Sequence, residues 1–278
     1  MMQTKFQQDL VIHPEEFRLF SELVHRVCGI NLTPGKNSLV RNRLLKRLRL
    51  HNCPSFEAYF RLIQNDATGA ELQVMVDLIT TNETHFFREA STFRFFGQEI
   101  LGNRNAGRHL PADRPFRVWS AAASSGEEAY SIAMVLADRL GRRPWSVLGS
   151  DINRSVLDFA ASAVYAINDA SDIPRYYLNE YCLKGHGSMR DYFTVVPEIR
   201  TNVQFRQVNL HAELPDLPEF DCVFLRNILI YFSPTDKTEI VRRVLKCLRP
   251  GGYLMIGLSE SLHLDGLRKI RPAVFQKL

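Results

Sequence analysis

The sequence has few cysteines, and they are scattered along the chain. Its 278 residues include five, an odd number, and none belongs to a CxxC motif or a Cys/His cluster. We therefore expect no disulfide framework and no metal site, and free thiols indicate a reducing cytoplasm. The five are Cys28, Cys53, Cys182, Cys222 and Cys247.

Long apolar runs are absent as well. No apolar signal region opens the chain, and no run approaches the roughly 20 apolar residues that span a bilayer. We therefore expect a cytoplasmic protein that does not insert into a membrane. The net charge of +5 is mildly basic, and a hydrophobic share of 45% is enough for a substantial core. A chain of this length has room for one large and one small domain.

Residues 1–80 show no strand pattern, and they predict a small all-helical domain. A helix begins well at Pro14, because proline suits a first helical position and two glutamates follow it. Phe17, Phe20 and Leu23 then recur at helical spacing. Further helices are predicted over 37–50, 55–64 and 69–80.

The rest of the chain alternates between strand and helix patterns. Residues 81–105 form a connector with a helix over 91–100, and residues 106–278 form the larger domain. The alternation predicts an α/β fold, a doubly wound Rossmann-like sheet with helices on both faces. Residues 170–202 carry turn formers around short alternating runs, and they predict an inserted antiparallel β-subdomain. The predicted strands are 116–121, 146–150, 203–208, 220–225, 251–258 and 273–277; the predicted helices are 126–140, 153–165 and 234–248.

The stretch FRVWSAAASSGEEAYSIAM, residues 116–134, carries the most information. An apolar strand runs into a turn of small residues, and a helix then opens with Glu127 and Glu128. The next apolar run ends in Asp151. A strand, a tight turn, a helix and an acid closing the next strand form a nucleoside-binding unit, in which the acid accepts hydrogen bonds from ribose hydroxyls. The pattern therefore indicates a cofactor that contains adenosine.

Dinucleotides fit this unit poorly. They place a pyrophosphate at the helix N-terminus, where bare N–H groups attract anions, whereas two carboxylates here would repel it. Gly126 is also the only glycine of the fingerprint. S-adenosylmethionine fits better, because it has a sulfonium, an amino acid tail and no phosphate. The alternative, that Glu127 and Glu128 only stabilise a helix start capped by Ser124 or Ser125, stays open.

Two polar segments are candidates for the rest of a site. Residues 80–89, TTNETHFFRE, lie between the two domains, where ligand sites often form. Residues 224–232, FLRNILIYF, follow a predicted strand at the edge where doubly wound sheets bind ligands. Burying Arg226 and Asn227 there is costly without partners. A capped helix start in the first segment and a heavily bonded pair in the second remain alternatives.

Taken in order, these motifs resemble the CheR family. TTNETHFFRE, WSAAASSGEEAYSIAM, SDIN, VNL and RNILIYF follow one another along nearly the whole chain. The resemblance implies a class I methyltransferase that transfers a methyl group from S-adenosylmethionine to glutamate carboxylates of chemotaxis-type receptors. The products would be glutamate methyl esters and S-adenosylhomocysteine, and the process sensory adaptation. One departure is Ala129, where the family commonly has a proline that would only stiffen the first helical turn.

The resemblance also implies roles for individual residues. Arg88 and Tyr231 would be catalytic, Asp151 would take the ribose hydroxyls, and Glu128, in preference to Glu127, would hold the methionyl side. The full set implied to bind the cofactor is Asn82, Thr84, Arg88, Glu128, Asp151, Asn209, Leu210, Arg226 and Asn227.

The chemistry of such a transfer suits these residues. A glutamate side chain is ionised at neutral pH, so it can attack a sulfonium methyl without a general base. What remains is in-line positioning. Arg88 could orient the substrate carboxylate bidentately, and Tyr231 could share that role. His85 lies close in sequence, and we interpret it as a packing or surface histidine.

Residues 36–50 form a basic helix with six cations and no acid. A solvated outer face is one interpretation, and a surface that follows nucleic acid phosphates is another. The resemblance favours a third, docking on the glutamate-rich helical region of a receptor, and we expect no nucleic acid partner. The predicted docking residues are Arg41, Arg43, Lys46, Arg47 and Arg49.

The predicted β-subdomain has a further candidate role. In part of the family it holds a receptor C-terminal peptide by adding a strand to its edge. Gly185 and Gly187 fit a tight turn there, but Asp191 stands where another glycine is expected, so a purely structural flap stays open. We expect a monomer that is recruited to receptor arrays. Two other functions remain as alternatives: an RNA or small-molecule methyltransferase on the same fold, and a catalytically silent cofactor-binding signalling module.

Overall fold

The computed structural model describes residues 10–102 and 114–278. The parts of the predicted domains that fall on residues 1–9 and 103–113 lie outside the described residues. Within the described ranges, no helix combines the length and the apolar character needed to cross a bilayer.

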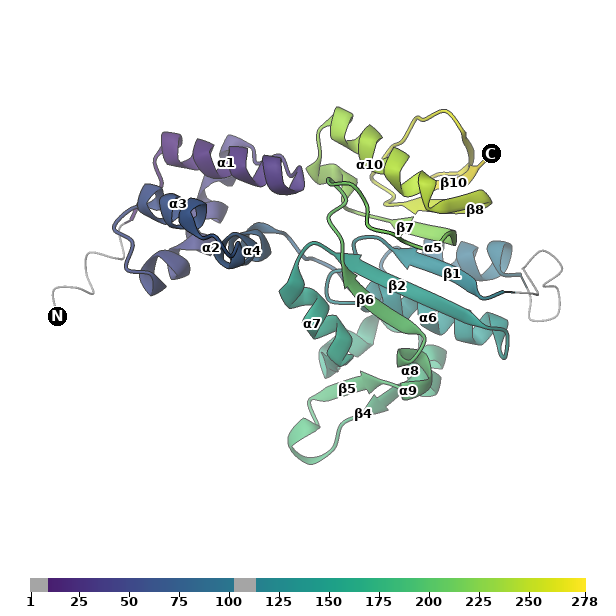
Figure 1. Cartoon of the computed structure of the whole chain (residues 1–278). Coiled ribbons are helices and arrows are strands. Elements are labelled where there is room, and N and C mark those ends of the chain that lie inside the picture. Colours follow the sequence, from purple (N-terminus) through teal and green to yellow (C-terminus); the bar gives the residue numbers. More distant parts are fainter. Residues whose placement is uncertain (1–9, 103–113) are drawn as a thin grey trace. The chain divides into compact units, whose positions relative to one another are not determined.

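The chain forms two compact units (Figure 1). The division falls just before the polar segment that starts at Asn82, and a short piece after residue 230 belongs with the N-terminal helices. Unit 1 comprises Met1–Thr81 and Tyr231–Asp236; unit 2 comprises Asn82–Ile230 and Lys237–Leu278.

Unit 1 is helical. Pro14 begins the first helix, as predicted, and Glu16 caps this start by accepting a hydrogen bond from the His13 backbone N–H at 2.9 Å. Gly29, at φ 73°, ends this helix. The other three predicted helices are confirmed to within one residue. The α-helices are α1 (Pro14–Cys28), α2 (Asn37–Leu50), α3 (Phe56–Asn65) and α4 (Ala70–Ile79), with a 3₁₀ turn η1 (Pro34–Lys36).

The core of unit 1 is built around aromatic and aliphatic side chains and includes the buried acid Glu71. Phe20 and Leu44 are fully buried, and Tyr59 stacks on Phe20 with ring centroids 6.2 Å apart. The Tyr59 hydroxyl donates to Glu71 at 2.6 Å, and Arg47 Nε donates to the same carboxylate at 2.8 Å. These two donors satisfy a carboxylate that would otherwise be costly to bury.

Unit 2 is built on a seven-stranded sheet in the order β6-β2-β1-β7-β8-β10-β9. The first five strands are parallel, and β10 and β9 add an antiparallel edge. The predicted α/β class and its Rossmann-like sheet are confirmed. The strands are β1 (Phe116–Ser120), β2 (Trp145–Asp151), β6 (Val203–Gln207), β7 (Phe220–Leu225), β8 (Leu248–Ile256), β9 (Leu267–Arg271) and β10 (Val274–Lys277).

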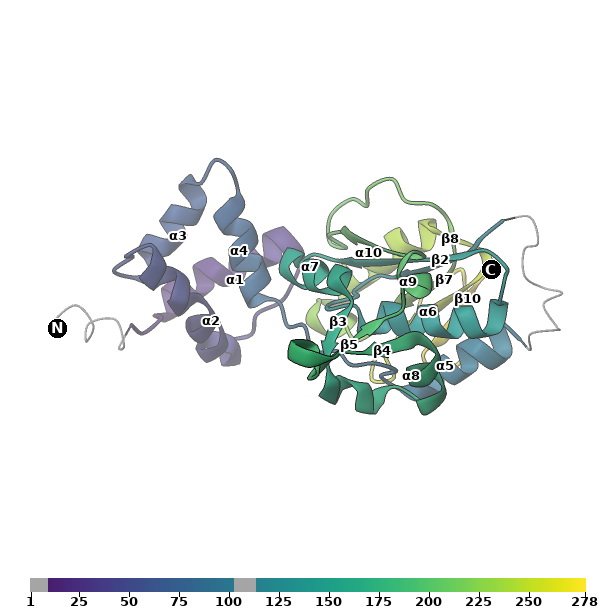
Figure 2. The same ribbon diagram turned by 90° about the horizontal axis from the view of Figure 1, so that it is seen from below.

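Helices pack on this sheet because their apolar faces need cover. Helix α6 lies on β1 and β2, and α7 lies on β2 and β6 (Figure 2). Every residue of α6 from Glu127 to Leu136 is buried. The helices are α5 (Ala90–Phe95), which continues into a π-helical turn η2 (Phe96–Ile100), α6 (Glu127–Leu140), α7 (Arg154–Ser162) and α10 (Pro234–Lys246), with a 3₁₀ turn η5 (Leu229–Tyr231).

The predicted antiparallel β-subdomain is present as a second sheet in the order β3-β5-β4, and Figure 1 shows β4 and β5 extending away from the large sheet. Gly185 is required here, because a Cβ on it would lie 2.0 Å from the Met189 carbonyl oxygen. The elements are β3 (Val164–Ala166), η3 (Ile167–Asp172), α8 (Arg175–Tyr181), β4 (Cys182–Lys184), η4 (Gly187–Met189), β5 (Tyr192–Val195) and α9 (Pro197–Arg200).

Two boundaries differ from the prediction. The helix predicted over 153–165 ends at Ser162, because Ala163 turns into the left-handed region at φ 54°, so the subdomain starts with β3 instead of at residue 170. Strand β9 was not predicted. Its sequence LRKIR is mostly charged and exposed, as edge strands often are, so it lacks the apolar alternation that marks a strand.

Candidate functional site

The turn after β1 is tight because its residues are small. Ala123 N donates to the Ser150 carbonyl at 2.8 Å, which ties the turn to β2. Gly126 has φ 97°, and a Cβ on it would lie 2.8 Å from Ala160 Cβ and 2.9 Å from Tyr165 Oη. Only glycine fits there. The turn that leads into α6 therefore has the close approach that the sequence predicts for a nucleoside-binding unit.

Asp151 closes β2, and its carboxylate is held by the backbone. Ser124 N donates to Oδ2 at 2.9 Å, and Asn153 N donates to Oδ1 at 3.0 Å. A carboxylate oxygen can accept more than one hydrogen bond. Asp151 is thus fixed in position at the carboxyl end of its strand, in a form that can also accept from hydroxyl groups.

Asn209 and Leu210 follow β6 beside Asp151. Val208 N donates to the Asp151 carbonyl at 3.0 Å, which joins the ends of the two strands. Asn209 Oδ1 accepts from His211 N at 3.0 Å, and Leu210 is buried. The structure therefore brings three of the predicted cofactor residues to one edge of the sheet, while their contact with a ligand stays a prediction.

Arg226, directly after β7, is a buried cation whose side chain is only 1% exposed. Its Nη1 donates to Glu128 Oε2 at 2.7 Å, and its Nη2 donates to the Arg88 carbonyl at 2.5 Å and to Glu89 Oε2 at 3.1 Å. The guanidinium carbon lies 5.4 Å from the centroid of the Phe93 ring. A buried charge needs such partners, and here they come from two separate segments of unit 2, residues 88–93 and the start of α6.

The two glutamates at the start of α6 differ in their partners. Glu128 is fully engaged, since Ser120 Oγ donates to Oε1 at 2.7 Å and Arg226 donates to Oε2. Glu127 is buried. It accepts from Ser125 Oγ, at 2.9 and 2.7 Å, and from its own backbone N–H, and it forms no ion pair with a described residue. Burial raises the pKa of Glu127, although the hydrogen bond from Ser125 opposes the shift. Glu127 is therefore the carboxylate at this turn that lacks a cation.

The segment from Asn82 to Arg88 runs beside the turn. The Asn82 carbonyl accepts from Ser124 Oγ at 3.0 Å, and Arg88 Nη1 donates to the Glu83 carbonyl at 2.8 Å. Thr84 is half-buried. The backbone of this segment is thus joined both to the nucleoside-binding turn and, through the Arg88 carbonyl, to Arg226.

His85 and Tyr231 also belong to the polar segments, but their contacts differ from those of the residues around Arg226. The His85 side chain is 50% exposed, and its Nδ1 lies 3.6 Å from Asp172, which is a surface position. Tyr231 belongs to unit 1, where its carbonyl accepts from Asn31 N at 2.9 Å. A catalytic pairing of Tyr231 with Arg88, which belongs to unit 2, stays a prediction.

Two further acids at this edge were missed by the sequence analysis. Glu89 accepts from Arg226 and from Asn227 Nδ2, the latter at 3.2 Å. Glu260 accepts from backbone N–H groups in the turn after β7. Glu260 follows the end of β8 much as Arg226 follows the end of β7, so its place after a parallel strand was the available signal.

Most of the predicted docking cations are bound inside unit 1. Arg41 Nε and Arg43 Nη1 each donate to a backbone carbonyl at 2.6 Å, and Arg47 pairs with Glu71. Their charge remains on the helix, but their donors are partly used. The two members of the set that are exposed are Lys46 and Arg49.

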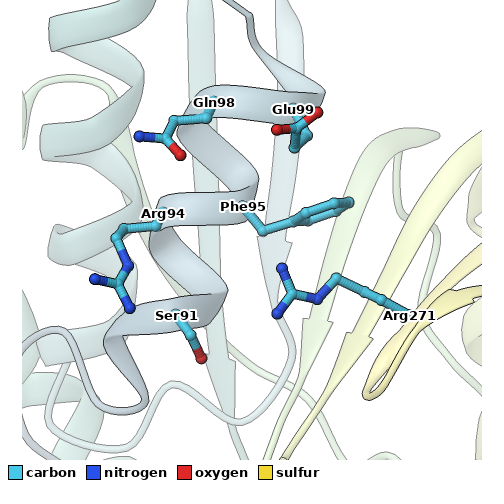
Figure 3. A pocket seen from close by; sticks show the side chains of 6 residues that line it. All are labelled: Ser91, Arg94, Phe95, Gln98, Glu99 and Arg271. Carbon is cyan, nitrogen blue, oxygen red and sulfur yellow. The ribbon is translucent and has the colours of Figure 1, made fainter.

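A separate hollow of about 340 Å³ lies on unit 2 (Figure 3). Arg271 reaches across it from β9 and stacks on Phe95, with its guanidinium carbon 5.1 Å from the ring centroid. The mixed charges on its wall point to no single class of ligand. Among the described residues, no three His, Cys, Asp or Glu side chains gather as a metal site requires. The hollow is lined by Ser91, Arg94, Phe95, Gln98, Glu99 and Arg271.

Comparison with known proteins accounts for both units. Residues 82–273 match the family model described as CheR methyltransferase, SAM binding domain, and residues 15–80 match CheR methyltransferase, all-alpha domain. The chain is 38% identical over 257 residues to a chemotaxis protein methyltransferase of Salmonella typhimurium, covering 91% of this chain and 86% of the relative. The relative from Escherichia coli is 38% identical, with 92% and 88% covered, and chemotaxis protein methyltransferase 2 of Pseudomonas aeruginosa is 39% identical, with 89% and 86% covered.

The burial of Arg226 predicts a large loss of stability on its removal. Arg226→Ala should lower the free energy of unfolding by about 3–5 kcal/mol, because Glu128 and Glu89 would then lack their cation in a buried setting. Arg242→Ala is the matched control, since its pair with Glu239 is exposed and should contribute less than about 1 kcal/mol. Urea unfolding followed by circular dichroism measures both. Equal, small losses would contradict this account of the buried cation.

Proposed function

The chain belongs to the CheR family of S-adenosylmethionine-dependent methyltransferases, and we propose that its substrate is a glutamate carboxylate of a chemotaxis-type receptor. The product would be a glutamate methyl ester. The structural observation that carries the proposal is the acidic edge of the sheet, where the carboxylates of Asp151 and Glu127 flank a tight turn that only glycine fits.

The residues at this edge fit S-adenosylmethionine. Asp151 is fixed at the end of β2, where an acid suits ribose hydroxyls, and Asn209 and Leu210 stand next to it for the adenine. We assign the ammonium of the methionyl tail to Glu127, reversing the preference for Glu128 that the sequence suggested. Both oxygens of Glu128 already accept from Ser120 and Arg226, whereas Glu127 is buried and forms no ion pair with a described residue.

The chemistry needs no general base. S-adenosylmethionine supplies a methyl group on a sulfonium; its transfer forms a bond between that carbon and a carboxylate oxygen, breaks the carbon–sulfur bond and leaves S-adenosylhomocysteine. Arg88 is suited to orient the attacking carboxylate, because one guanidinium nitrogen is used on the Glu83 carbonyl and others remain to donate. We assign Tyr231 to the same task. Correct orientation of the reacting groups accounts for the rate enhancement.

Receptor recognition belongs in this proposal to unit 1 and to the small sheet. The exposed cations Lys46 and Arg49 on α2 would attract a glutamate-rich helical region, and that attraction should weaken with salt. Strand β4 is an edge of the small sheet, and Leu183 on it is exposed, so a receptor peptide could add there as a further strand. We place the protein in the cytoplasm as a monomer that joins receptor arrays.

The nature of the methylated group tests the proposed function. Incubation with receptor-containing bacterial membranes and radiolabelled S-adenosylmethionine should give label that mild base releases as methanol, because carboxyl esters hydrolyse readily. Arg88→Ala should lose turnover by about 100-fold or more while keeping its far-ultraviolet circular dichroism. Base-stable label would indicate transfer to nitrogen or nucleic acid, and cofactor binding without transfer would indicate a silent module. Either result would contradict the proposal.

The raised pKa of Glu127 predicts how the affinity for the cofactor changes with pH. The ionised carboxylate holds the ammonium, so affinity should fall as the pH is lowered, and the raised pKa means that the fall begins at a higher pH than for an ordinary glutamate. Glu127→Gln should weaken binding by about tenfold or more and remove this pH dependence. Isothermal titration calorimetry measures both, with the exposed Glu99→Gln as control. An unchanged affinity and pH profile in Glu127→Gln would reject the assignment.

A further inference from the structure

Glu260 holds the backbone of the turn that follows β7. Its Oε2 accepts from Gly257 N at 2.7 Å and from Asn227 N at 3.0 Å, and its Oε1 accepts from Ile230 N at 3.3 Å. One carboxylate thus joins the loop after β8 to both ends of the turn over residues 227–230. The chain continues from Ile230 directly into Tyr231.

This turn has a backbone that needs support. Asn227 has φ 56°, the left-handed region that residues other than glycine adopt at a cost. The loop after β8 packs closely against it, since a Cβ on Gly257 would lie 2.7 Å from Asn227 Nδ2 and 3.0 Å from Asn227 N. The strained residue is therefore stabilised from outside, by the carboxylate and the close packing of the β8 loop.

Glu89 binds the same turn from the other polar segment. Asn227 Nδ2 donates to Glu89 Oε1 at 3.2 Å, and Leu258 N donates to both Glu89 oxygens at 3.2 and 3.1 Å. Arg226 is held independently, by Glu128 and by the Arg88 carbonyl. Loss of Glu260 would therefore release the turn beyond Asn227 while Arg226 stays in place.

Holding this turn with the carboxylate of Glu260 costs folding free energy. It is half-buried and forms no ion pair with a described residue. Burial raises its pKa, and the backbone hydrogen bonds offset only part of that shift. A charge kept in such a place without a cation costs folding free energy, which is typical of residues retained for the geometry of a site.

We propose that Glu260 is a positioning residue for methyl transfer, whose carboxylate fixes the turn over residues 227–230, the last residues before Tyr231 in the chain. This role rests on the proposed function. Glu260 would not touch substrate or cofactor itself. It would set kcat by keeping the turn in one conformation, and cofactor binding would depend on it little, because Arg226 and Asp151 are anchored by other groups.

Hydrogen exchange tests the structural half of this proposal without any turnover. In Glu260→Ala, the amides of the peptide over residues 226–231 should exchange about tenfold or more faster than in the wild type, because their acceptor is lost. In Glu260→Gln, one oxygen acceptor remains, and the increase should be smaller. Unchanged exchange in both variants would overturn the proposal, whether or not the proposed function holds.

Steady-state kinetics with the receptor substrate test the functional half. We expect kcat to fall by about 100-fold in Glu260→Ala and less in Glu260→Gln, while the S-adenosylmethionine Kd and the receptor KM each change less than about threefold. The control is Asp221→Asn, whose carboxylate accepts from Arg117 N at 2.9 Å at the opposite end of β7. That variant should lower Tm and keep kcat.

Three results would distinguish a failure of the proposed function from a failure of the positioning role of Glu260. A wild-type protein that transfers no methyl group to receptors defeats the proposed function, and hydrogen exchange still decides whether Glu260 holds the turn. A wild-type kcat in Glu260→Ala overturns the positioning role. So does an equal loss of kcat in Asp221→Asn at a matched Tm, because the effect would then come from general destabilisation. If Glu260→Ala does not fold, Glu260→Gln provides the same comparison.

Discussion

The buried guanidinium of Arg226 is the interaction on which the arrangement of the candidate site depends. A cation that is 1% exposed must be neutralised and hydrogen bonded inside the protein. Its partners come from the first turn of α6, through Glu128, and from the segment before α5, through the Arg88 carbonyl and Glu89. Because the charge of Arg226 must be neutralised, the three loops that carry Arg226 and its partners are held against one another at the carboxyl ends of the parallel strands.

The acids at this edge of the sheet fall into two groups, those that bind groups of the protein's own scaffold and those that we propose for the cofactor. Glu128 and Glu89 are committed to Arg226, and Glu260 is committed to the backbone of the turn after β7. Asp151 accepts from two backbone N–H groups, and Glu127 accepts from the Ser125 hydroxyl and forms no ion pair with a described residue; these are the two acids that we propose for a ligand with hydroxyl groups and an ammonium. In our proposal, a rigid scaffold of paired charges thus supports a smaller set of acids that bind the cofactor.

Much of the fold was predictable from the sequence because short-range patterns along the chain determine the strands, turns and helices. The strand, small-residue turn and helix around Gly126 follow from periodicity and from the space that only glycine leaves. The division between Glu127 and Glu128 was not predictable, since adjacent residues of one type differ only in what tertiary structure brings to them. Glu260 was missed for the same reason: the turn that it holds, over residues 227–230, lies about 30 residues away in sequence. Strand β9 was missed because an exposed edge strand need not alternate.

The central claim is that the charge network is complete before the cofactor binds and that the cofactor meets the remaining acids. A crystal structure with S-adenosylhomocysteine tests this most directly. We expect the ammonium within hydrogen-bonding distance of Glu127, the ribose hydroxyls on Asp151, and the pair between Arg226 and Glu128 as it is here. An ammonium bound to Glu128, with Arg226 displaced from it, would contradict the account.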